Sequence, residues 1–310
     1  MNLPAAKLED RIILITGATS GIGKAAAHLI ATMGARVVIT GRNKEKLEKT
    51  VQELKSQTGN GSVNYLVADF SDLDQVREMA SDFEDRYACL DVLVNNTGAF
   101  FNKRQETIYG VEKTFVVNHL APFLLTNMLM ETMRRREEAR IINVSSDAHQ
   151  YGSLDFDDLE FKHGYAGMKA YARSKLSNIL FTYEAARRLA GSAITVNALH
   201  PGHVATNIFR NDFSFFGPAL KWVMGLFSLT PEEGADNTVF LATSPEVKGV
   251  TGKYFVKREV VRSSRITYNE DLAKKLWQIS EKLTSLSPTE PVDIQYTTTS
   301  ESGVKNGYFS

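Results

Sequence analysis

Residues 11–23 read RIILITGATSGIG, and this stretch decides the fold. Its first half, Arg11 to Thr16, is dominated by a continuous apolar run, which is typical of a strand buried on both faces of a parallel sheet. The run leads into the loop Gly17 to Gly23, and a helix of small and apolar residues follows as far as Met33. A strand, a glycine loop and a helix in this order point backbone N–H groups at a pyrophosphate. The stretch therefore predicts a dinucleotide-binding α/β fold.

The spacing of the glycines leaves a second interpretation open. Gly17, Gly21 and Gly23 form Gly-x3-Gly-x-Gly, which differs from the Gly-x-Gly-x-x-Gly of the standard dinucleotide fingerprint. Such a loop can also be only a tight turn between a strand and a helix. We interpret it as a cofactor loop because a buried strand precedes it and a helix follows it.

The end of the second expected strand indicates which dinucleotide is bound. This strand, Arg36 to Thr40, leads into Gly41-Arg42-Asn43. In dinucleotide folds an acidic residue here binds the ribose hydroxyls, whereas an arginine accepts a 2′-phosphate. No carboxylate is present, and Arg42 is available, so the sequence favours NADP over NAD. The alternative is that Arg42 is a surface arginine without this role.

Five further strands are expected from short apolar or β-branched runs. They bring the sheet to about seven strands, and the segments between them have helical periodicity, including a long helix from Val111 to Arg135. The fold class predicted is a single-domain, Rossmann-type doubly wound parallel α/β sheet with helices on both faces, over residues 1–286. The five strands are residues 64–68, 91–94, 140–144, 194–199 and 252–256.

The helix expected from Gly164 to Leu189 carries a second decisive pattern. Tyr171 and Lys175 lie four residues apart, so they share one face of the helix. A phenol loses its proton near pH 10, and an ammonium about one helical turn away is expected to lower that pKa toward the working pH. The pair is a candidate general acid/base, although Tyr and Lys at this spacing also occur in helices without catalytic roles.

The composition excludes several classes of protein. The 310 residues include 36 basic and 36 acidic side chains, so no general electrostatic attraction to nucleic acid is expected. Cys89 is the only cysteine, which argues against an intrachain disulfide. The six histidines lack ligand spacing apart from His200 and His203, which lie on the Pro-Gly turn, so no metal site is expected. No signal peptide and no apolar run near the roughly 20 residues of a membrane helix is found. We expect a soluble cytoplasmic protein.

Two C-terminal segments are expected to lie outside the regular sheet. Phe213 to Leu229 is the most aromatic and apolar stretch outside the strands, and we interpret residues 205–229 as a flap over the site. Core packing, an oligomer contact or peripheral membrane attachment are the alternatives for this segment. Residues 287–310 are rich in Ser and Thr and contain two prolines, which is typical of a flexible tail.

Six motifs stand in order along the chain and together resemble the short-chain dehydrogenase/reductase family over about residues 8–286. The retinol dehydrogenase-like branch is indicated by residues 143–149, the insertion before Tyr171 and Ser174 to Asn178. One departure from the family is Thr97, which stands where alanine is usual. The six motifs are Thr16 to Gly23, Asn95-Asn96-Thr97-Gly98, Asn118, Ser145-Ser146, Tyr171-x3-Lys175 and Pro201-Gly202.

The resemblance implies a role for each matched position. Tyr171 exchanges a proton with the substrate oxygen, and Lys175 lowers the pKa of this tyrosine and binds the nicotinamide ribose. Ser146, or its neighbour Ser145, hydrogen-bonds the carbonyl, while Asn118 holds a water for proton relay. Both Tyr171 and Lys175 also contact the dinucleotide. The other cofactor-binding positions are Gly17, Ser20, Gly21, Ile22, Gly23, Arg42, Asp69, Asn95, Pro201, Val204 and Thr206.

The function expected from the sequence is an NADP(H)-dependent oxidoreductase that interconverts an alcohol and a carbonyl on a small apolar substrate. Retinoids, steroids, fatty aldehydes and ketones all fit this description. The resemblance also implies a homo-oligomer, either a dimer or a tetramer. The alternative function is a catalytically silent dinucleotide-binding scaffold or redox sensor that acts through the C-terminal tail.

Overall fold

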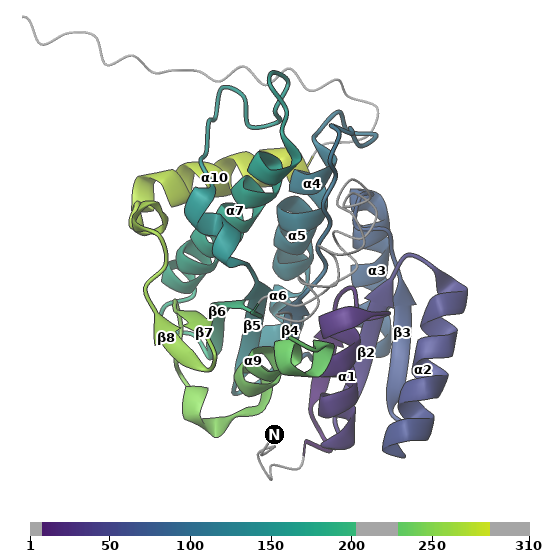
Figure 1. Cartoon of the computed structure of the whole chain (residues 1–310). Coiled ribbons are helices and arrows are strands. Elements are labelled where there is room, and N and C mark those ends of the chain that lie inside the picture. The colour runs from purple at the N-terminus through teal and green to yellow at the C-terminus, as the bar shows by residue number, and fades with distance from the viewer. Residues whose placement is uncertain (1–7, 203–228, 286–310) are drawn as a thin grey trace, which may run out of the picture.

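The computed structural model describes residues 8–202 and 229–285, and a single eight-stranded sheet runs through its centre (Figure 1). The spatial order is β3-β2-β1-β4-β5-β6-β7-β8, and all neighbours are parallel except the antiparallel pair β7 and β8. The strands are β1 (Ile12–Ile15), β2 (Arg36–Gly41), β3 (Val63–Val67), β4 (Val92–Asn95), β5 (Ala139–Val144), β6 (Ile194–His200), β7 (Tyr254–Val256) and β8 (Glu259–Val261).

Helices cover both faces of this sheet. Figure 1 shows α1, α2 and α9 on one face and α3, α5 and α7 on the other, with α10 packed against α7. The α-helices are α1 (Gly21–Thr32), α2 (Lys44–Thr58), α3 (Leu73–Arg86), α4 (Lys113–Phe115), α5 (Ala121–Met128), α6 (Met130–Arg134), α7 (Gly167–Arg188), α9 (Pro231–Thr243) and α10 (Glu270–Thr284). A π-helix spans Val116–Leu120, and 3₁₀ turns span Asp147–Tyr151, Pro245–Val247 and Arg265–Tyr268.

Alternation along the strands explains the two layers of core. Leu14 of β1 packs into the hydrophobic cluster on the α3, α5 and α7 side, whereas Ile13 and Ile15 pack into the cluster on the α1 and α9 side. Successive side chains of a strand point to opposite faces, so a strand covered on both faces needs an unbroken apolar run. The predicted doubly wound α/β fold is confirmed.

Local signals in the sequence also place the helix ends. Asn43 caps α2, because its side-chain oxygen accepts a hydrogen bond from the Lys46 N–H at 2.8 Å. Asp72 caps α3 in the same manner and accepts from the N–H groups of Asp74 and Gln75. These caps fix where each helix leaves the carboxyl edge of the sheet.

Two features differ from the prediction. The chain turns back after β7 through Lys257 and Arg258, both with left-handed φ, and adds the short antiparallel strand β8. The helix expected over residues 111–135 is present: α4, the π-helix and α5 follow one another without a gap over residues 113–128, and α6 follows after Leu129, but the π-helical stretch was not predicted. Pro122 lies in the first turn of α5, and because proline has no N–H it cannot donate to the carbonyl of Asn118. The π-helix, in which the Ala121 N–H donates to the Val116 carbonyl, lies directly before this proline.

The expected flap and tail cannot be compared with the structure. Residues 205–228 of the flap, Val204, Thr206 and the tail 287–310 lie outside the described residues. Within the described ranges, no helix is both long enough and apolar enough to cross a membrane.

Candidate active site

The glycine loop after β1 is joined to the segment after β4 by a set of main-chain contacts. The Thr16 hydroxyl accepts hydrogen bonds from the N–H groups of Asn96 at 3.0 Å and Thr97 at 2.9 Å. The Asn96 side-chain amide donates to the carbonyl of Thr16 at 2.7 Å. A Cβ at Gly23 would lie 2.4 Å from this amide nitrogen, so only glycine fits there. The strand order reverses between β1 and β4, and ligands of doubly wound sheets bind at this point.

The N-terminus of α1 has the free donors that a pyrophosphate needs. Ser20 occupies the N-cap with an extended backbone, but its side chain makes no capping hydrogen bond. The first turn also carries no acidic residue. The first N–H groups of a helix have no intrahelical partner, and a phosphate can accept hydrogen bonds from them. The residues present therefore fit a dinucleotide phosphate, with Gly17 and Gly21 in the left-handed backbone region that the loop requires.

The residues expected around the adenosine ribose are in three different environments. Arg42 follows β2, is exposed, and makes no hydrogen bond or ion pair within the described ranges. Asp69 follows β3, and its carboxylate accepts hydrogen bonds from the N–H and the hydroxyl of Ser71, both at 2.9 Å. The side chain of Asn95 is turned into the core, where it donates to Thr126 at 3.0 Å and Asn143 at 2.9 Å. Any cofactor contact of Asn95 would thus come from its main chain.

Tyr171 and Lys175 lie on one face of α7, as their spacing predicts. The Lys175 Nζ lies 5.5 Å from the centroid of the Tyr171 ring and donates to the Val144 carbonyl at 3.0 Å. Lys175 is only 3% exposed, and this burial lowers its pKa to about 8.

The pKa of Tyr171 moves in the direction opposite to the sequence argument. Burial raises it to about 12, and the hydrogen bond with Ser146 opposes this effect without cancelling it. The Lys175 Nζ lies over the Tyr171 ring and is directed at the carbonyl of Val144. In the protein alone, Tyr171 is therefore a proton donor at neutral pH.

The two serines after β5 have different hydrogen-bond partners. The Ser145 hydroxyl is buried and donates to the main-chain carbonyl of Lys175 at 2.8 Å. The Ser146 hydroxyl instead hydrogen-bonds Tyr171, donates to the Asp147 carboxylate at 3.0 Å and accepts from the Ala148 N–H at 3.2 Å. Of the two alternatives left by the sequence, Ser146 is the one directed at the tyrosine.

Asn118 lies in the π-helix and is fully buried behind this group. Its amide nitrogen donates to the Ala99 carbonyl at 3.0 Å and to the Ser174 hydroxyl at 2.9 Å, while its oxygen accepts from the Ala99 N–H at 2.7 Å. The side chain thus ties α7 to the segment after β4. A water relay through Asn118 would use its main-chain carbonyl, which lacks its α-helical partner at Pro122.

Two residues near the site were not identified from the sequence. His149 is buried; its Nε2 accepts from the Ser264 N–H at 3.0 Å, so its Nδ1 donates to the Ser146 carbonyl at 2.7 Å. Burial lowers the pKa of His149, which suits this neutral role. Phe100 packs edge-on against Tyr171 with ring centroids 6.1 Å apart. Neither contact has a sequence signal, because both connect distant segments.

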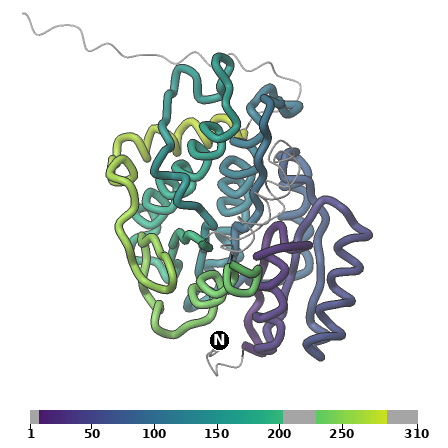
Figure 2. The backbone as a smooth tube through the Cα atoms, in the orientation of Figure 1, coloured from purple at the N-terminus to yellow at the C-terminus, as the bar shows by residue number. Residues whose placement is uncertain are grey.

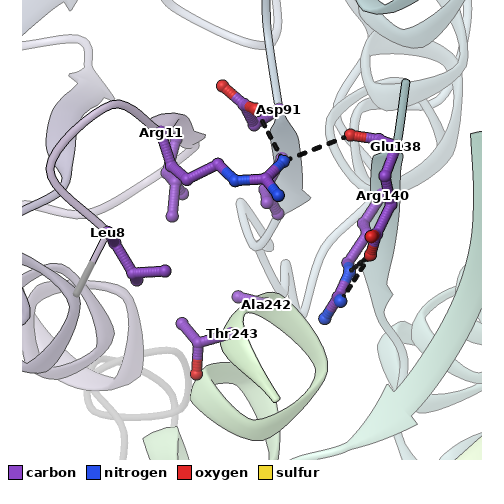
Figure 3. Close-up of a pocket in the computed structure, with 9 residues that line it drawn as sticks. Leu8, Arg11, Asp91, Glu138, Arg140, Ala242 and Thr243 are labelled. Atoms are coloured by element: carbon purple, nitrogen blue, oxygen red, sulfur yellow. Dashed lines mark hydrogen bonds and ion pairs between the residues drawn. The ribbon is translucent and has the colours of Figure 1, made fainter. Parts of the chain in front are cut away.

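A separate pocket lies at the opposite, amino edge of the sheet. Figure 3 shows its lining, in which Arg11 reaches Asp91 and the main chain of Glu138, and Arg140 pairs with Glu138. It has about 50 Å³ of space, and none of the catalytic or cofactor-binding residues predicted from the sequence lines it. Pro201 follows β6 at the carboxyl edge, together with the glycine loop and the serine pair. The candidate site is therefore at the carboxyl edge. No cluster of metal-binding side chains is found among the described residues.

Similar proteins identify the family to which this chain belongs. The sequence model of the short chain dehydrogenases matches residues 11–215. Human retinol dehydrogenase 14 is 38% identical over an alignment of 294 residues that covers 90% of this chain and 88% of that protein. Human polyprenol dehydrogenase is 36% identical and is covered over 86% of its length, with 89% of this chain. The solved Pseudomonas aeruginosa RhlG/NADP active-site complex is 28% identical with a TM-score of 0.66, and covers 82% of this chain and 97% of its own.

The chain belongs to the short-chain dehydrogenase/reductase family. Within this family it falls in the retinol dehydrogenase-like branch, as its motifs indicate. It is an oxidoreductase of a family that uses a nicotinamide dinucleotide and interconverts alcohols and carbonyls.

Proposed function

We propose that this protein is an NADP(H)-dependent oxidoreductase that acts on an apolar alcohol or carbonyl compound with Tyr171 as general acid/base. The observation that carries the proposal is the meeting of three groups at the carboxyl edge of the sheet. Tyr171 is hydrogen-bonded to Ser146, and Lys175 lies buried beside its ring. This group lies at the same edge as the crevice between β1 and β4, where the dinucleotide is expected.

The side chains of the site then have distinct tasks. When bound, the nicotinamide would supply or accept the hydride. The Tyr171 hydroxyl would donate a hydrogen bond to the substrate oxygen, where negative charge develops as a carbonyl is reduced, and the Ser146 hydroxyl would turn from Asp147 to donate a second. Tyr171 gives its proton to that oxygen, and its raised pKa keeps the proton available at neutral pH. Lys175 donates a hydrogen bond to the Val144 carbonyl, which fixes its side chain, and it would hold the nicotinamide ribose.

The preference for NADP(H) rests on Arg42. This exposed guanidinium follows β2 without a partner in the described residues, and no carboxylate lies beside it at the strand end. A similar protein, RhlG, has been solved with NADP, which supports the assignment.

Arg42→Ala tests the cofactor preference. A charged hydrogen bond to the 2′-phosphate contributes about 1.5–3 kcal/mol, so the NADPH Michaelis constant should rise roughly 10- to 100-fold. The constant for NADH should change less than about 2-fold, because NADH has no phosphate at this position. An equal change for both cofactors would contradict the role of Arg42.

The apolar character of the substrate rests on the surroundings of Tyr171. The Phe100 ring packs edge-on against Tyr171, with ring centroids 6.1 Å apart. The relatives' names refer to retinol and polyprenol, which are apolar alcohols.

The experiment that tests the function is oxidation of NADPH and NADH by the purified protein across a panel of apolar aldehydes and ketones, including retinal. We expect turnover with NADPH and at least one apolar carbonyl. Tight NADPH binding by fluorescence, with no turnover across the panel in either direction, would contradict the proposal and favour a catalytically silent scaffold.

The proposal includes a homo-oligomer and a cytoplasmic location, which rest on the family resemblance and on the composition. Light scattering of the full chain and fractionation of the host cell test these two points directly.

A further inference from the structure

The insertion between β5 and α7 is held by one buried arginine. Arg173 of α7 is 5% exposed, and its guanidinium donates to three main-chain carbonyls of the insertion. The acceptors are Ser153 at 3.0 Å, Asp158 at 2.6 Å and Leu159 at 2.9 Å. Carbonyl oxygens need a donor when they are buried, and the rigid planar fork of arginine supplies several donors at fixed angles.

The same guanidinium is stacked on an aromatic ring of the insertion. It lies 3.6 Å from the centroid of Phe161, a buried residue whose φ of 50° is left-handed. A bulky residue rarely adopts this conformation, and the strain of about 1–3 kcal/mol persists only where the surroundings impose it. The contact with Arg173 accounts for the position of Phe161.

Phe161 connects Arg173 to the loop after β4. Its ring packs edge-on against Tyr165 at 6.0 Å, and the Tyr165 hydroxyl donates to the Phe101 carbonyl at 2.7 Å. A second hydrogen bond joins the same two segments, because Arg104 Nε donates to the Glu160 carbonyl at 3.1 Å. Figure 2 shows the insertion and the loop of residues 99–112 projecting from the same end of the molecule.

The loop after β4 in turn contacts the catalytic face of α7. Phe100 packs against Tyr171, and its ring lies close to Gly167, one turn earlier on that face. A Cβ at Gly167 would lie 2.5 Å from the Phe101 carbonyl oxygen and 3.1 Å from the Phe100 ring. The series of contacts that begins at Arg173 thus ends on α7 beside Tyr171.

We propose that Arg173 is a positioning residue that fixes the insertion and, through Phe161 and Tyr165, the Phe100–Phe101 loop as the substrate-side wall next to Tyr171. The inference rests on the proposed function, in which the substrate oxygen meets Tyr171. It predicts that loss of Arg173 weakens binding of the carbonyl substrate and leaves dinucleotide binding unchanged, because the glycine loop is held by the separate contacts of Thr16 and Asn96.

Two variants of the full chain test this inference. Arg173→Lys keeps the charge but cannot reach three carbonyls, and Tyr165→Phe removes only the hydroxyl that holds Phe101. We expect Arg173→Lys to raise the KM of the best carbonyl substrate about 10-fold or more and Tyr165→Phe about 3-fold. In both variants kcat should stay within about 3-fold and the NADPH dissociation constant should not change. Lys169→Ala, an exposed charge loss on the same helix, is the control and should change none of these.

Hydrogen exchange separates this inference from the proposed function. Arg173→Lys should speed amide exchange in residues 152–161 and 99–104 and leave residues 17–33 as in the wild type. Unchanged exchange in both loops, or a fall in kcat with KM unaltered, would overturn the inference. If the wild type turns over no carbonyl at all, the proposed function fails, and the exchange pattern alone decides whether Arg173 fixes these loops.

Discussion

The two edges of the sheet differ in whether a buried charge has a partner of opposite charge. At the amino edge the Asp91 carboxylate is fully buried and accepts a hydrogen bond from Arg11 at 2.9 Å (Figure 3). It also accepts from Arg136 at 2.6 Å and from the Ile12 N–H at 2.8 Å. At the carboxyl edge the ammonium of Lys175 is buried with the Val144 carbonyl, and no carboxylate within the described ranges pairs with it.

This difference separates stability from function. A buried carboxylate with two arginines and a backbone donor is neutralised, and such a cluster fixes the strands that it joins. A buried ammonium without a counter-ion costs free energy, and residues with this kind of perturbed pKa are concentrated at functional sites. The comparison therefore assigns the amino edge to folding and the carboxyl edge to chemistry, which substitutions at each edge can test.

Asp91→Asn should have the largest effect on folding. It leaves two arginines without their counter-ion, so the free energy of unfolding should fall by about 2–4 kcal/mol, since both arginines are partly exposed. Urea unfolding measures this value. The control is Asp82→Asn, whose exposed pair with Arg86 should contribute less than about 0.5 kcal/mol. If the two variants lost similar amounts of unfolding free energy, the structural role of the amino edge would be contradicted.

Lys175→Met should behave in the opposite manner. Removing the uncompensated charge should preserve the free energy of unfolding or raise it by about 1–3 kcal/mol at pH 7. Turnover should fall roughly 100-fold or more, because the group beside Tyr171 is lost. A variant that is clearly destabilised would show that the lysine is structural.

The pH dependence of stability sharpens this test. Burial lowers the pKa of Lys175 to about 8. Below that pH the lysine is protonated in both states and the folded state bears the cost of burial. Between about pH 8 and pH 10 the unfolded chain retains the proton that the folded chain has released, so the wild-type free energy of unfolding gains a term that rises with pH. The difference in the free energy of unfolding between the wild type and Lys175→Met should therefore become smaller between about pH 8 and pH 10. A constant difference would contradict the burial argument.

The serine pair should give the smallest change in stability. Ser145→Ala removes one buried hydrogen bond to the Lys175 carbonyl, so it should cost about 1 kcal/mol of stability with turnover within about 3-fold. Ser146→Ala should cost about 0.5–1 kcal/mol of stability, because its hydroxyl accepts from the Ala148 N–H, and should lower kcat on the order of 100-fold, because an oxyanion donor is lost. Stopped-flow turnover with parallel thermal unfolding distinguishes the two, and the reverse pattern would exchange their roles.

Most of the fold could be predicted because buried parallel strands are apolar runs with clear ends. β8 was missed because it has three residues, and its turn uses Lys257 and Arg258 where left-handed turns usually carry Gly or Asn. The π-helix within the helix expected over residues 111–135 was not predicted, because its residues have the same periodicity as a regular α-helix.

The candidate site was less predictable than the fold. The helical spacing of Tyr171 and Lys175 was sufficient to place them on one face, but not to show that burial dominates both pKa values. The roles of His149 and Arg173 depend on main-chain partners, which have no signature in the sequence.

The most direct test of the central claim is Tyr171→Phe, which removes one hydroxyl from a buried ring and keeps its packing. Turnover of the best apolar carbonyl with NADPH should fall by about 10²- to 10⁴-fold, whereas NADPH binding by fluorescence and the thermal unfolding midpoint should match the wild type. Turnover that stays within a few-fold of the wild type would show that Tyr171 is not the acid/base and that the carboxyl-edge group is not the catalytic centre.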